Sequence, residues 1–290
     1  MRILSYGEII YDMLPSGACL GGAPLNVAVH LARMNVEAGL VSAIGPDELG
    51  RRAIKEIAQN NVRTELIQLV DAETGRADVS ISEDGSANYV FNKPAAWDRI
   101  ELFSIEYELT DPEWDGFVFG TLAQRSKVSR DTLHAILEEF SFKEILFDVN
   151  LRGDFHTKAI IKKGISCSTI LKMNDDESKV VLNILGLESL DDILSKNRGL
   201  KGILLTKGSE GIDYIARNAR YHQDVIPSNV VDTVGAGDSV SAAFLHSYIA
   251  TDGDVPKALK KAAILSSFVV STQGATSPYP DALAKEMRKK

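Results

Sequence analysis

Short apolar segments alternate with amphipathic helical segments along almost the whole chain. The segments expected to be strands are residues 3–9, 38–44, 117–119, 145–149, 170–173 and 203–206. Helical periodicity is clear in residues 25–34, which follow Pro24, and in residues 48–60. This alternation is typical of a layered α/β architecture in which helices flank a mainly parallel sheet.

One region departs from the α/β rhythm. From Ala77 to Phe91 apolar and polar residues alternate on both sides of a Glu-Asp-Gly turn at residues 83–85. The pattern predicts a β-hairpin. A hairpin inserted into an α/β chain is either a decoration at a sheet edge or a lid over a ligand, and the pattern alone leaves both open.

Composition limits the classes of function. The 290 residues are 44% hydrophobic, which is enough for a large core in one or two domains. A net charge of -8 argues against nucleic-acid binding as the main task, although it leaves room for a local basic pocket. With only two cysteines, no signal-peptide pattern and no apolar run of membrane length, we expect a cytoplasmic protein. The five histidines lack metal-ligand spacing.

A glycine-rich segment near the C-terminal end carries the most chemical information. It reads DTVGAGDS from Asp232 to Ser239 and leads into an amphipathic helix. The small residues at 235–237 would let a phosphate approach the unpaired N–H groups of a helix start. Asp238 would then lie beside the anion, where a carboxylate can accept a proton from an attacking hydroxyl. Alone, the segment favours a plainer interpretation, a turn with Asp238 as the helix N-cap.

A second glycine segment near the N-terminus also opens a helix. It reads GGAPLN from Gly21 to Asn26, and Asp12 precedes it, soon after the first strand. Ligands commonly bind at such strand ends in open α/β sheets. Asp12 and Asn26 are short polar groups that can bind vicinal hydroxyls. By itself this segment, too, is compatible with a turn and an N-cap.

Together the two segments resemble the two signatures of the ribokinase-like (PfkB) carbohydrate kinases. The matching stretches are GGAPLNVAVHLARM and DTVGAGDSVSAAFL. Between and after them, further stretches resemble family segments in the same order: IGPDELGRR, KMNDDE, LLTKGSEG and STQGATSPYP. The resemblance covers nearly the whole chain.

The resemblance implies a single ribokinase-like kinase domain over residues 1–290. Its fold would be a doubly wound, mainly parallel sheet flanked by helices, with a small β-lid around residues 75–95. It therefore favours the lid over the edge decoration, since a lid would exclude water and prevent wasteful hydrolysis of ATP. Lids of this family often pair, so a homodimer is expected. The implied ligands are ATP, Mg²⁺, a sugar and a monovalent cation such as K⁺.

The resemblance also implies roles for individual residues. Asp238 matches the catalytic base, and the anion hole matches Gly235, Ala236 and Gly237. Acceptor-binding positions match Asp12, Gly22 and Asn26. The magnesium-phosphate side matches Asn174 and Glu177, where Glu177 would act through ordered water; without the family, Glu177 would be a solvated helix residue. The nucleotide edge matches Thr206, Gly208 and Gly211, and the monovalent-cation loop matches Asp232, Val234 and Gly274.

Several stretches resemble fructokinases in particular. They are GEIIYDMLP, GTLAQRS, FNKPAAWD and DVNLRGDFH, the last of which puts Arg152 at a strand end facing the site. An arginine there can hold sugar hydroxyls or a phosphate; the alternative is a surface salt bridge. The chain departs from fructokinases in a short segment between Asp12 and Gly21 and in Trp97, which leaves the sugar open. It also departs at Val234 and Ser239, where the loop works mainly through its backbone.

The sequence thus predicts an ATP-dependent kinase that converts D-fructose to fructose 6-phosphate. The alternatives are a sibling kinase for 2-keto-3-deoxygluconate, ribose or a nucleoside, and a non-catalytic sugar-binding regulatory protein on the same fold. A Rossmann dehydrogenase is disfavoured because no G-x-G-x-x-G follows the first strand.

Overall fold

The main sheet is the framework of the molecule. The computed structural model describes residues 1–15, 17–81, 87–110 and 113–289. Within these ranges nine strands form one sheet in the order β13-β12-β11-β10-β9-β8-β1-β4-β5. The strands are β1 Arg2–Tyr6, β4 Glu37–Ile44, β5 Ile67–Leu69, β8 Trp114–Phe119, β9 Phe142–Asp148, β10 Ile170–Asn174, β11 Gly202–Thr206, β12 Ile212–Ala216 and β13 Ala219–Gln223. From β5 to β11 neighbours are parallel, and β12 and β13 add an antiparallel edge.

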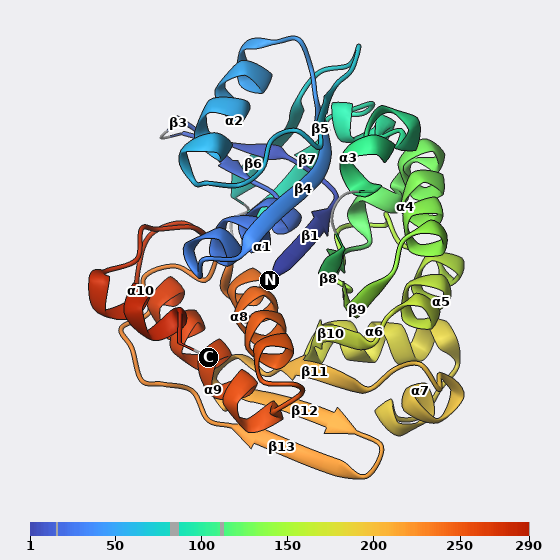
Figure 1. Cartoon of the computed structure of the whole chain (residues 1–290), viewed down its shortest axis with the longest axis vertical. Coiled ribbons are helices and arrows are strands. Elements are labelled where there is room, and N and C mark those ends of the chain that lie inside the picture. Colours follow the sequence, from blue (N-terminus) through green and yellow to red (C-terminus); the bar gives the residue numbers. More distant parts are fainter. Residues whose placement is uncertain (16, 82–86, 111–112, 290) are drawn as a thin grey trace.

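Helices cover both faces of this sheet (Figure 1). They are α1 Ala23–Arg33, α2 Glu48–Gln59, α3 Glu106–Thr110, α4 Lys127–Glu139, α5 Lys158–Cys167, α6 Asp175–Leu185, α7 Leu190–Lys196, α8 Ala236–Ala250, α9 Val255–Val270 and α10 Asp281–Met287. Short 3₁₀ turns span η1 Ala96–Arg99, η2 Leu102–Ser104, η3 Leu122–Arg125 and η4 Gly208–Glu210. Ile3 packs in a core shared with α1, α8 and α9, whereas its neighbour Leu4 packs with α4 and α5. The expected α/β fold with a mainly parallel sheet is therefore confirmed.

A second, smaller sheet is formed by strands in the order β3-β2-β6-β7. Its strands are β2 Ile10–Leu14, β3 Gly17–Gly21, β6 Gly75–Ile81 and β7 Ala87–Phe91. The antiparallel pair β6–β7 confirms the predicted hairpin, although the turn predicted at residues 83–85 lies outside the described residues. Strands β2 and β3 belong to the same sheet, with Asp12 paired to Ala77 of β6. The sequence prediction did not include these two strands.

The prediction of a single first strand over residues 3–9 was wrong. The chain leaves the main sheet after Tyr6 and enters the small sheet at Ile10. Gly7 lies between them with φ 146°, a backbone conformation that other residues rarely adopt. A side chain there would also meet Pro24, since its Cβ would lie 2.6 Å from Pro24 Cγ. This glycine lets one apolar segment serve two sheets.

No helix in the described part of the chain has both the length and the apolar composition needed to cross a membrane.

Candidate active site

The start of α8 is built by a glycine in a left-handed conformation. Gly235 is the N-cap residue, with φ 77°, and in the described part of the chain no side chain caps the first turn with a hydrogen bond. The N–H groups of this turn are therefore free of side-chain partners and carry the positive end of the helix dipole. Asp238 lies within the first turn of α8, so the alternative in which Asp238 is the N-cap is wrong.

A loop near the C-terminus packs tightly against this helix start. A Cβ on Gly235 would lie 2.4 Å from the Cβ of Ala275. His30 of α1 holds that loop, because its Nε2 lies 3.0 Å from the Ala275 carbonyl oxygen and its Nδ1 lies 2.7 Å from the Tyr279 hydroxyl. Burial lowers the pKa of His30 to about 3, so the ring is neutral and donates to the carbonyl. Position 235 thus requires glycine for two reasons: its φ angle is left-handed, and a Cβ there would clash with Ala275.

Asp238 joins the two glycine-rich segments. Its Oδ2 accepts a hydrogen bond of 2.7 Å from the Asn26 side-chain amide on α1. Burial raises the pKa of the Asp238 carboxyl to about 6, while the bond from Asn26 opposes this rise. A carboxyl with such a pKa is mostly ionised at neutral pH and can still take up a proton.

The other candidate acceptor residues lie on three separate segments of the chain. Asp12 lies on β2, and burial raises the pKa of its carboxyl. Gly22 has φ 115°, and a Cβ there would lie only 2.3 Å from the Glu8 carbonyl oxygen. Arg152 follows β9, and its positive charge lowers the pKa of both Asp12 and Asp238. Arg152 forms no ion pair with any described residue, so the salt-bridge alternative finds no support.

A cavity of about 540 Å³ borders the start of α8. Four predicted residues line it together with the start of α8: Asn174, Thr206, Gly208 and Gly211. Apolar side chains from Ile212, Val240 and Val270 cover part of its wall. The structure therefore brings four of the five predicted nucleotide-side residues to one cavity, which borders the predicted anion hole at Ala236 and Gly237; Glu177 does not line it.

Asn174 and Glu177 form a capping box at the start of α6. Asn174 Oδ1 accepts from the Glu177 N–H at 2.8 Å, and Glu177 Oε2 accepts from the Asn174 N–H at 2.9 Å. Glu177 Oε1 also accepts from the Leu151 N–H at 2.9 Å. Glu177 is 8% exposed, so the alternative of a solvated helix residue is wrong. Its geometry fixes the segment that carries Arg152, and its magnesium role stays a prediction.

The three residues of the predicted cation loop also lie together. Asp232 Oδ1 accepts from the Val234 N–H at 3.0 Å, and its Oδ2 accepts from the Gly274 N–H at 2.9 Å. One carboxylate thus ties the segment before α8 to the loop after α9. Within the described ranges no group of three or more histidine, cysteine or acidic residues could hold a metal ion. Binding of a monovalent cation here stays a prediction.

A comparison with protein families assigns the chain. A model of the pfkB family carbohydrate kinases matches residues 19–282. The chain belongs to this family. It is therefore a sugar kinase with the ribokinase-like fold.

Relatives of this kinase carry related names at modest identity. An uncharacterized sugar kinase from Pyrococcus horikoshii is 28% identical over 276 residues, covering 91% of this chain and 85% of the relative. Its crystal structure superposes with a TM-score of 0.87 and covers both chains completely, and a second structure of it contains ATP. A fructokinase from Klebsiella pneumoniae is 27% identical over 270 residues, covering 84% of this chain and 83% of its own. A fructokinase from Xylella fastidiosa with bound ATP has a TM-score of 0.86 at 21% identity, covers 99% of this chain and 97% of its own, and supports the fold alone.

Three buried charged residues interact electrostatically with Asp238 and were not predicted as site residues from the sequence. Glu8 is 4% exposed, and burial raises the pKa of its carboxyl to about 7, while the charge of Arg152 opposes the rise. Asp148 and Lys172 form a buried ion pair, with 2.9 Å between Asp148 Oδ1 and Lys172 Nζ. All three lie in stretches that resemble the family, but only burial and distance distinguish them from surface charges.

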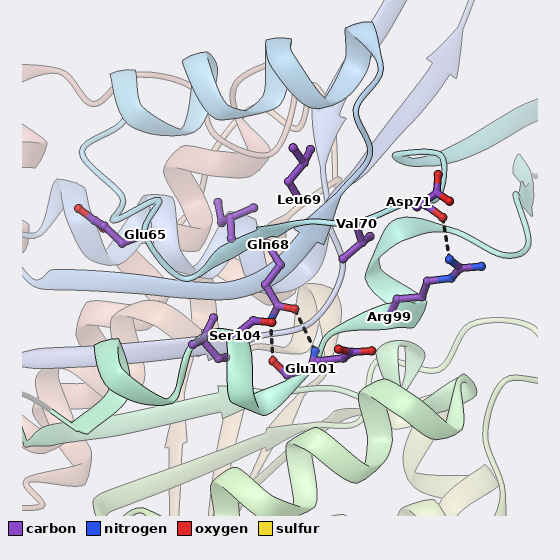
Figure 2. A pocket seen from close by; sticks show the side chains of 10 residues that line it. Glu65, Gln68, Leu69, Val70, Asp71, Arg99, Glu101 and Ser104 are labelled. Atoms are coloured by element: carbon purple, nitrogen blue, oxygen red, sulfur yellow. Dashed lines mark hydrogen bonds between the residues drawn. The ribbon is translucent and has the colours of Figure 1, made fainter.

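Another cavity, of about 440 Å³, lies at the β5 edge of the main sheet (Figure 2). Its polar groups bind one another. The Gln68 side chain accepts from the Glu101 N–H and donates to the Glu101 carbonyl, both at 3.0 Å, and Arg99 donates to the Asp71 carbonyl at 2.6 Å. None of the residues at the α8 site lines this cavity. It is not the candidate active site of the kinase.

Proposed function

We propose that this kinase transfers the γ-phosphoryl group of ATP to a hydroxyl of an unphosphorylated sugar, and that the sugar is D-fructose, giving fructose 6-phosphate. The observation that carries the proposal is the Asp238 carboxyl. It lies in the first turn of a helix whose start lines a nucleotide-sized cavity, and the Asn26 side-chain amide donates to it at 2.7 Å.

In the proposed reaction Asp238 removes the proton of the sugar hydroxyl as its oxygen attacks the γ-phosphorus. The bond between the γ-phosphorus and the bridging oxygen breaks, and ADP leaves with that oxygen. The N–H groups of Gly235 and Gly237 would stabilise the negative charge that the phosphoryl group carries during transfer, whereas the Ala236 N–H donates to the Thr233 carbonyl at 3.3 Å. Asn26 would keep the carboxylate directed toward the hydroxyl.

The residues on the phosphate side fit magnesium held by phosphates and water. Both oxygens of Glu177 accept backbone N–H groups, which leaves a water-mediated contact rather than direct ligation. Magnesium bound there would neutralise charge on the β- and γ-phosphates. A K⁺ ion near the loops joined by Asp232 belongs to the same proposal, as does a cytoplasmic location.

The charges of the acceptor side favour a sugar without a phosphate group. Asp12, Glu8 and Asp238 all interact electrostatically with the Arg152 guanidinium. A phosphate group already present on the acceptor sugar would be repelled by these carboxyls. The name fructokinase, carried by several relatives at about 27% identity, supports fructose among the neutral sugars.

We extend the proposal to the small sheet, which would act as a lid over the sugar. Asp12 lies on β2 and pairs with Ala77 of β6, so a sugar held by Asp12 would contact this sheet directly. A closed lid would keep water from the γ-phosphoryl group. Pairing of two lids in a homodimer is part of the same proposal.

A substrate panel tests the proposed function. ADP release is measured with fructose, tagatose, ribose, 2-keto-3-deoxygluconate, adenosine and fructose 6-phosphate at matched concentrations. We expect the highest kcat/KM for fructose and little turnover of fructose 6-phosphate. A clearly higher kcat/KM for another acceptor would replace fructose with that compound. Sugar binding in calorimetry without ADP release for any acceptor would support the regulatory alternative instead.

A further inference from the structure

A buried ion pair, joined by a serine hydroxyl of α8, contacts the proposed catalytic helix. Lys172 of β10 is 5% exposed and Asp148 of β9 is 4% exposed. Asp148 Oδ1 lies 2.9 Å from Lys172 Nζ, and Asp148 Oδ2 accepts from the Ser241 hydroxyl of α8 at 2.9 Å. Burying an ion pair costs desolvation energy that mutual attraction often only balances. Stabilisation of the fold alone therefore does not explain why this ion pair is buried here.

The lysine is aimed at the glycine loop. A Cβ on Gly237 would lie 2.9 Å from Lys172 Nζ, so the ammonium lies against the residue that precedes Asp238. Because Asp148 holds the ammonium and both groups are buried, Lys172 is not free to swing away. Although burial alone would lower the pKa of Lys172, the carboxylates of Asp148 and Glu177 raise it, so the side chain stays charged.

Charged and polar groups from several elements face Asp238. Asn26 comes from α1, Glu8 from the turn after β1, Arg152 from the loop after β9, and the ion pair from β9 and β10. Lys172 and Asp148 act on the Asp238 carboxyl in opposite directions, since Lys172 favours its charged form and Asp148 disfavours it. The two members of the pair therefore have separable effects.

We propose that Lys172 is a positioning residue for phosphoryl transfer: fixed by Asp148 and Ser241, its ammonium lies against Gly237 and holds the Asp238 carboxylate in its charged form. The inference rests on the proposed function, in which ionised Asp238 takes the proton of the sugar hydroxyl. The competing explanation is that the pair only ties β9, β10 and α8 together.

Three variants separate these explanations: Lys172→Met, Asp148→Asn and the double variant. The reaction needs ionised Asp238, so kcat/KM falls as pH drops through the pKa of Asp238, near 6 in the parent protein. In Lys172→Met the loss of the ammonium raises the pKa of Asp238, so the acid limb of the pH profile of kcat/KM moves to higher pH. In Asp148→Asn the loss of the negative charge lowers the pKa of Asp238, so the acid limb moves to lower pH. We expect shifts of about one pH unit in opposite directions, and a return toward the parent midpoint in the double variant.

A second readout makes the outcome independent of catalysis. The Asp238 carboxyl carbon is followed by NMR during a pH titration, its resonance being identified as the one absent from Asp238→Asn. If this titration moves in opposite directions in the two single variants while the activity limb stays fixed, the effect of Lys172 on the Asp238 carboxylate is supported, and the proposed function is overturned because Asp238 is not the base. If Lys172→Met does not fold, Asp148→Asn and the double variant still report the shift. An unmoved Asp238 titration in the folded variants would overturn the inference and leave a purely structural pair.

Discussion

At the residue scale, the site depends on side chains from opposite ends of the sequence that meet at one carboxyl. Asn26 on α1 donates to Asp238 on α8, and Arg152 acts on the same carboxyl from the loop after β9. None of these groups is close to another in sequence. Their placement comes from the parallel sheet, which brings the carboxyl ends of its strands to one edge.

Arg152→Ala tests the acceptor side. The Arg152 side chain is exposed, and its one hydrogen bond within the described residues goes to the Leu151 carbonyl. Its charge also interacts with the Asp12 carboxyl, so we expect the guanidinium to bind the sugar. Loss of one hydrogen bond to the sugar costs roughly 1–3 kcal/mol, or about a 5- to 150-fold rise in the KM for fructose with kcat little altered. Steady-state kinetics measure this split.

Arg51→Ala is the matched control for Arg152→Ala, since Arg51 is an exposed arginine that pairs with Glu48 on α2. A fall of kcat and kcat/KM together in Arg152→Ala would assign the guanidinium to the phosphoryl group. If neither constant changes, Arg152 has no role in the site.

Residue identity in the site was predicted from the sequence where a motif contains it, and missed where only burial reveals it. The helix-start glycines, Asp238 and Asn26 lie in glycine-rich segments whose local sequence pattern already indicates their chemistry. Lys172 and Asp148 look like ordinary charges in the sequence. Their function depends on a buried 2.9 Å contact between adjacent strands, which no local pattern encodes.

At the element scale, the start of α8 is the feature on which both sides of the site depend. Gly235 combines φ 77° with a close approach to Ala275, and His30 keeps that neighbour in place. Asp232 ties the same segment to Gly274. The helix start, the loop after α9 and α1 therefore form one connected unit.

Gly235→Ala tests this unit. The new Cβ would clash with Ala275 and force a left-handed backbone on a residue that avoids it, at a cost of about 1–3 kcal/mol in the free energy of unfolding. We also expect a higher KM for ATP, because the distorted turn borders the nucleotide-side cavity. Urea denaturation and kinetics measure both quantities. Gly199→Ala is the control, since a Cβ there meets nothing within 4 Å. Equal behaviour of the two variants would contradict the account.

The hairpin β6–β7 was predictable because its alternation is local, whereas its partners β2 and β3 were not. A single apolar run from Ile3 onward contributes strands to both sheets. The two strands are separated only by the backbone conformation at Gly7. Trp97, a departure from fructokinases, is fully buried with its ring against Gly75 of β6. Such packing between distant segments leaves no periodic signal.

At the scale of the whole molecule, the described residues form a nine-stranded sheet with helices on both faces and a separate four-stranded sheet (Figure 1). Alternation of strands and helices predicts the large sheet, since parallel strands need helical crossovers. The proposed closure of the small sheet over a sugar can be measured directly.

Hydrogen exchange tests the lid. If fructose binds against Asp12 on β2, the paired amides of β6, Gly75–Ile81, will exchange more slowly with sugar present. At a sugar concentration ten times its Kd we expect about tenfold slower exchange. Amides of α7, Leu190–Lys196, serve as the internal control because this helix lies far from the small sheet (Figure 1). Equal protection in β6 and α7, or none in β6, would contradict closure over the sugar.

The central claim is tested most directly by Asp238→Asn, assayed for phosphorylation of fructose at saturating ATP. The amide keeps the shape of the side chain and can still accept the hydrogen bond from Asn26, but it cannot take up a proton. We predict a loss of about 10²- to 10⁴-fold in kcat with fructose affinity, measured by calorimetry, nearly unchanged. Asp176→Asn, an exposed position that loses only a surface pair with Lys179, should keep parent activity. An Asp238→Asn enzyme that retains half of the parent kcat would show that Asp238 is not the base.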